Sequence, residues 1–69
     1  MSKLVQKRLD EVNDLLKTNM CVEQNGRYYT LYSDSKRGHK LNSVITRIEI
    51  IEILNTIIEM HRSLLIQVN

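Results

Sequence analysis

The chain has 69 residues, a net charge of +2 and one cysteine, Cys21. A chain of this length forms one domain that buries only about 60% of its unfolded surface. Such a domain often needs disulfides, metals or oligomerisation for its stability. One cysteine excludes an intrachain disulfide, and no paired His or Cys spacing indicates a zinc site. We therefore expect no metal, no cofactor and an oligomer. The sequence has no run of about 18 apolar residues, so we expect no helix that crosses a membrane. The lone cysteine fits the cytoplasm.

Residues 2–18 are predicted to form the first helix. Four apolar residues follow one another at helical spacing and define one stripe: Val5, Leu9, Val12 and Leu16. Ser2 is a suitable N-cap, because its hydroxyl can accept a hydrogen bond from a free backbone N–H of the first turn. Thr18 or Asn19 is expected to end the helix.

Residues 20–33 are predicted to form a β-hairpin. Asn25-Gly26 is a strong turn signal, because a type I′ turn needs positive φ at both central positions. With these two residues as the loop, Val22 pairs with Tyr29. The inner face of the hairpin then consists of Met20, Val22, Tyr29 and Leu31. The outer face consists of Cys21, Glu23, Tyr28, Thr30 and Tyr32.

Residues 34–41 are predicted to form a basic loop. Residues 42–67 are predicted to form a long helix that begins at Asn42 or Ser43. The apolar residues of this helix, with Val44 at its start, fill an arc of about 180°, whereas one intramolecular neighbour needs only about 100°. The surplus predicts a second helical neighbour, most simply another copy of the chain. The predicted oligomer interface consists of Ile50, Ile53, Leu54, Ile57, Met60, His61 and Leu64.

Together these elements predict a single α+β domain spanning residues 1–69, in the order α-β-β-α. An isolated hairpin is marginal in water, so we expect it to pack on the two helices. The last helix would then mediate a homodimer, with a tetramer as the alternative.

Catalytic chemistry is not indicated. Cys21 has no histidine near it in sequence to activate the thiol. Glu49, Glu52 and Glu59 lie along one strip of a helix instead of facing each other in a cleft. His61 falls inside the apolar arc, where we expect it at the edge of an interface, with a pH-sensitive or metal-binding role as the alternative. We therefore predict no catalytic residues, no enzyme activity and no small-molecule substrate.

The functional signal is a group of aromatic and basic residues on the hairpin and loop. Tyrosine and arginine are enriched at protein interfaces, but aromatics beside basic residues also bind single-stranded nucleic acid, and the tyrosines could instead simply pack over the hairpin. The predicted partner-binding residues are Arg27, Tyr28, Tyr32, Lys36, Arg37 and Lys40.

A protein partner is favoured over nucleic acid because the net charge is only +2 and no basic helical face is present. We predict a non-catalytic protein-binding module, an adaptor or inhibitor, with a small nucleic-acid-binding regulator as the alternative. No family is indicated by any motif. In size and in its Ile-, Asn- and Lys-rich composition the chain resembles compact accessory proteins of phages and mobile elements.

Overall fold

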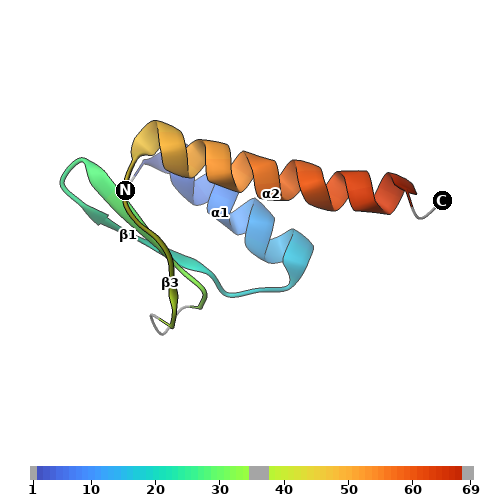
Figure 1. Ribbon diagram of the computed structural model, residues 1–69, viewed down its shortest axis with the longest axis horizontal. Helices are drawn as coiled ribbons and strands as arrows, with labels where there is room; N and C mark the ends of the chain where they lie inside the picture. The colour runs from blue at the N-terminus through green and yellow to red at the C-terminus, as the bar shows by residue number, and fades with distance from the viewer. Residues whose placement is uncertain (1, 35–37, 68–69) are drawn as a thin grey trace.

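The computed structural model describes residues 2–34 and 38–67, and the side chains of all of these except residues 42–44 and 65–67. The chain has an α+β fold in which the hairpin packs on two helices, as predicted (Figure 1). Its elements, in chain order, are α1 (Lys3–Leu16), β1 (Cys21–Asn25), β2 (Tyr28–Tyr32), β3 (Lys40–Thr46) and α2 (Arg47–Gln67).

The third strand, β3, was not predicted. It pairs antiparallel with β2, so the sheet has the order β1-β2-β3. The sequence interpretation gave these residues to the basic loop of residues 34–41 and to a helix starting at Asn42 or Ser43, and both assignments are wrong. Val44 therefore belongs to a strand and does not widen the apolar arc of the helix. The β-branched run at residues 44–46 suits a strand, and a third strand stabilises a hairpin that is marginal alone.

The extra strand sets the direction of α2. Three antiparallel strands return the chain to the end at which α1 began, so α1 and α2 run side by side in the same direction (Figure 1). The predicted order with two strands would have made the helices antiparallel.

α2 starts with a capping box formed by Thr46 and Glu49. The Thr46 backbone N–H and hydroxyl donate to Glu49 Oε1 at 3.1 and 2.9 Å, and the Glu49 N–H donates to Thr46 Oγ1 at 3.3 Å. The backbone hydrogen bond from Thr46, and then its side-chain hydrogen bond, lower the pKa of Glu49 below its ordinary value of 4.5. Thr-x-x-Glu is a sequence signature of a helix start, and it is the signal that the sequence interpretation missed.

The two ends of α1 also differ from the prediction. The Ser2 side chain makes no capping hydrogen bond, although its carbonyl accepts the Gln6 N–H at 3.0 Å. The helix ends at Leu16, and its C-cap is Lys17, which adopts the left-handed conformation with φ 56° and ψ 44°, instead of Thr18 or Asn19.

The Asn13 side chain connects the end of α1 to the sheet. Its Oδ1 accepts the Met20 N–H at 2.8 Å and the Thr18 hydroxyl at 2.9 Å, and its Nδ2 donates to the Met20 carbonyl at 2.9 Å. One amide therefore satisfies both backbone groups of the residue that precedes β1.

The hairpin turn lies one residue later than predicted. Gly26 and Arg27 form the loop, and Val22 pairs with Leu31 instead of Tyr29. Gly26 has a φ of 65°, whereas Asn25 does not have a positive φ. A single positive φ at the first loop position fits a type II′ turn, not type I′. The shift moves each partner by two residues, so both faces keep their predicted members.

The core lies between the two helices and one face of the sheet. The predicted stripe of α1 and the predicted inner positions of β2 are confirmed, because Val5, Leu9 and Val12 are buried with Tyr29 and Leu31, and Leu16 packs against them half-buried. The core cluster consists of Val5, Leu9, Val12, Tyr29, Leu31, Ile45, Ile50, Leu54 and Ile58.

Candidate interaction surface

The predicted oligomer interface on α2 is divided between the core and the surface. Ile50 and Leu54 are fully buried inside the chain, so their assignment to an intermolecular seam is wrong. They face inward because α1 and the sheet both pack against this side of the helix.

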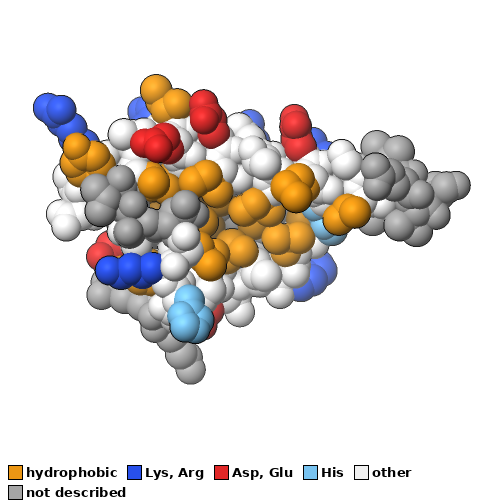
Figure 2. All heavy atoms as spheres, viewed as in Figure 1, with side chains coloured by type: hydrophobic (Ala, Val, Ile, Leu, Met, Phe, Trp, Pro, Cys, Tyr) orange, Lys and Arg blue, Asp and Glu red, His pale blue; other side chains and the backbone are white. Residues whose placement is uncertain are grey.

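Four other predicted interface residues form a row along α2, which we call the α2 stripe: Ile53, Ile57, Met60 and Leu64. Ile53 and Ile57 are half-buried against the core, whereas Met60 and Leu64 remain 61% and 60% exposed. Figure 2 shows hydrophobic side chains in a band along the helix. The C-terminal part of α2 extends past the end of α1 (Figure 1), which leaves this part of the stripe uncovered within the described chain.

Two shallow hollows adjoin the α2 stripe. The first has a volume of about 370 Å³ and is lined by Glu49, Glu52, Ile53, Thr56 and Ile57. The second has a volume of about 390 Å³ and is lined by Thr56, Glu59, Met60, Ser63 and Leu64. Each residue of the second hollow lies seven positions after a residue of the first. This heptad period is the spacing at which one helix receives the side chains of another.

Glutamates line one margin of the α2 stripe. Glu49, Glu52 and Glu59 are exposed on the margin that contains the hollows. Figure 2 shows acidic side chains above the hydrophobic band, and basic side chains both above and below it. His61, four residues after Ile57, is half-buried on the second margin.

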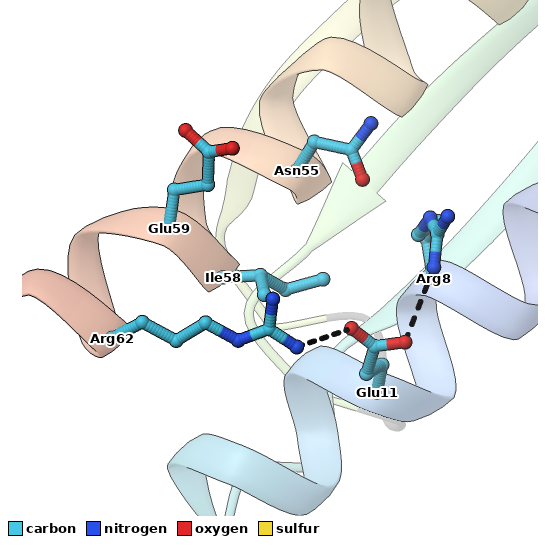
Figure 3. Close-up of a pocket in the computed structure, with 6 residues that line it drawn as sticks. All are labelled: Arg8, Glu11, Asn55, Ile58, Glu59 and Arg62. Carbon is cyan, nitrogen blue, oxygen red and sulfur yellow. Dashed lines mark hydrogen bonds and ion pairs between the residues drawn. The ribbon is translucent and has the colours of Figure 1, made fainter.

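A separate polar groove of about 370 Å³ lies between α1 and α2 (Figure 3). Glu11 accepts a hydrogen bond from Arg8 at 3.2 Å and forms an ion pair with Arg62 at 3.7 Å. Arg8 Nε is buried without a hydrogen-bond partner. Asn55, Ile58 and Glu59 complete the lining. Both arginines are directed at Glu11, and the Arg62 contact joins α2 to α1 across this groove.

The predicted partner-binding residues do not form one open face. Tyr28 is 47% exposed, and Arg27 and Lys40 are exposed. Tyr32 is only 8% exposed, so its prediction as a contact residue is wrong. It lies in the central strand between Cys21 and Lys40, and sequence reasoning that lacked β3 left it on an open edge. Lys36 and Arg37 lie outside the described residues.

Cys21 and the potential metal ligands are the remaining sequence candidates. The Cys21 thiol is half-buried and donates to the Asp34 carbonyl at 3.2 Å. Within residues 2–34 and 38–67, no three His, Cys, Asp or Glu side chains gather as metal ligands. Over the same part of the chain, neither helix combines the length and the apolar character needed to span a bilayer.

Comparisons with protein-family models, with curated proteins and with solved structures find no significant match to this chain. The functional argument therefore depends on the geometry of the α2 stripe.

Proposed function

We propose that this protein is a non-catalytic protein-interaction module that self-associates through the α2 stripe. The observation that supports this most directly is the exposure of Met60 and Leu64, at 61% and 60%, in line with two half-buried isoleucines. Burying such a side chain completely is worth about 1.5–3 kcal/mol. Covering the exposed part of both residues therefore offers about 2–4 kcal/mol per chain.

The charge beside the α2 stripe favours a protein partner over nucleic acid. The row of glutamates would repel phosphate groups, which dominate nucleic-acid affinity. The nucleic-acid alternative needed Tyr28 and Tyr32 to be exposed together, but Tyr32 is buried and only Tyr28 of the two is exposed. A small chain that gains stability from a second copy fits the general behaviour of domains of this size.

In this proposal the module acts as an adaptor or inhibitor in the cytoplasm. Self-association would present the exposed residues Arg27, in the turn, and Tyr28, at the start of β2, twice, which raises avidity for a repeated target. The single cysteine is compatible with a reducing compartment.

The test is the native mass by light scattering over a range of protein concentrations, with two matched variants. Met60→Glu places a charge on the α2 stripe, and Ile48→Glu places the same charge at a 69% exposed position on another side of α2. Because Met60 is mostly exposed, the first variant should stay folded yet become monomeric, since an interface cannot bury an unpaired charge cheaply. Ile48→Glu should keep the wild-type mass.

A wild-type protein that stays monomeric at every concentration would refute the proposal. Equal loss of mass in both variants would also refute it, because the effect would then not belong to the α2 stripe.

A further inference from the structure

The two hollows specify what kind of partner the α2 stripe accepts. They repeat at seven residues, which corresponds to about 10.5 Å along a helix. A partner that fills both must carry side chains at the same interval, as an α-helix with a heptad pattern does. α2 itself meets this requirement, since Ile53 and Met60, and likewise Ile57 and Leu64, are separated by seven residues.

We propose that the partner is a second copy of this chain whose α2 packs parallel to the first, around a two-fold axis that runs along the helices. This inference rests on the proposed self-association and adds its orientation.

The glutamates beside the hollows distinguish the two possible symmetric arrangements. Both hollows lie on the glutamate margin of the stripe, while the sheet packs on the opposite side of α2 near Ile50 and Leu54. A helix must therefore shift toward the glutamate margin to enter the hollows.

A two-fold axis along the helices reverses the two margins between copies. Each helix can then shift toward the glutamate margin of the other, and both pairs of hollows are filled. An axis across the helices puts the two glutamate margins on the same side. The glutamates of the two copies then lie next to each other along the pair, and their like charges repel.

Charge favours the same arrangement. With the axis along the helices, the glutamate margin of one copy faces the margin of the other that contains His61. The axis across the helices brings Glu59 of both copies to the same level when Ile53 pairs with Leu64, which places like charges near each other.

Disulfide trapping tests the orientation. In a Cys21→Ser background, the single substitutions Ile53→Cys and Leu64→Cys mark the two ends of the stripe, about 16 Å apart along the helix. A disulfide needs Cα atoms within about 7 Å of each other. In the parallel pair each position lies beside its own copy, so both variants should form covalent dimers under mild oxidation. Ile48→Cys is the exposed control off the stripe and should cross-link several-fold less.

The other outcomes separate the two proposals. Cross-linking that requires a mixture of the Ile53→Cys and Leu64→Cys proteins would show an antiparallel pair, which overturns the orientation but leaves self-association intact. A non-covalent dimer in which only Ile48→Cys cross-links would place the interface elsewhere and overturn both. Light scattering of each reduced variant shows whether the substitution itself preserved the dimer, and a wild-type monomer would overturn both proposals.

Discussion

Replacing Asn13 by alanine should remove one of the largest polar contributions to the stability of this fold. The Asn13 amide makes three hydrogen bonds of 2.8–2.9 Å, two with the Met20 backbone and one with the Thr18 hydroxyl. Each such bond contributes about 0.5–1.5 kcal/mol net. Because the groups are only part-buried and water can replace some bonds, we expect a loss of about 2–3 kcal/mol. This corresponds to roughly 10–20 °C in Tm for a domain of this size.

The assay is urea denaturation followed by circular dichroism, at one fixed protein concentration because self-association would add to the apparent stability. Thr18→Ala, which removes one of the three bonds, should cost about 1 kcal/mol. Asn19→Ala is the matched control, since Asn19 is exposed and a surface substitution changes stability by less than about 0.5 kcal/mol. If Asn13→Ala were no more destabilising than Asn19→Ala, the connection between α1 and β1 would not have the importance assigned to it.

Three further outcomes are expected from the geometry of α2. The hydrogen bonds from Thr46 lower the pKa of Glu49 in the folded state, so its stabilising contribution is present above the unfolded pKa and is lost as the pH falls through the folded pKa. Glu49→Gln should therefore flatten the loss of stability below pH 4.5, and an unchanged acid limb in urea titrations would contradict this. Leu54→Ala should cost about 2–5 kcal/mol because the side chain is fully buried, whereas Leu64→Ala should cost less than about 1 kcal/mol at concentrations where the protein is monomeric. Similar values for the two would show that the stripe is not separate from the core. Arg62→Ala should change the free energy of unfolding by less than about 1 kcal/mol, since its ion pair with α1 is exposed and 3.7 Å long, and a larger loss would mean that the polar groove is a main contributor to helix packing.

The local sequence pattern was sufficient to identify the buried face of an element that packs against the core with one face. The spacing of Val5, Leu9 and Val12 identifies the buried face of α1 because the helical period alone places them together. Alternation likewise assigned Tyr29 and Leu31 to the inner face of the sheet, and this held although the turn moved by one residue, because the pairing shifted by an even number.

The interpretation failed where one segment could satisfy two patterns. Residues 42–46 extend an apolar helical arc when they are read together with residues 47–67, and they also suit a strand. Pairing with β2 stabilises the strand over the helix. This stabilisation comes from a different segment of the chain, so the local pattern of residues 42–46 does not reveal it. The Thr46–Glu49 capping box was the one local signal that separated the two possibilities.

Periodicity in the amino-acid pattern was enough to establish the α+β class, the buried face of α1 and the excess of apolar surface on the last helix, because each depends only on the repeat of a helix or a strand. Tertiary contacts were needed for the parallel course of the helices, the burial of Tyr32 and the division of the α2 arc into a core side and an exposed stripe. The first two result from β3, whose position is set by hydrogen bonds to β2, and the third results from the packing of α1 and the sheet against α2. None of these long-range interactions can be read from the period of a single element.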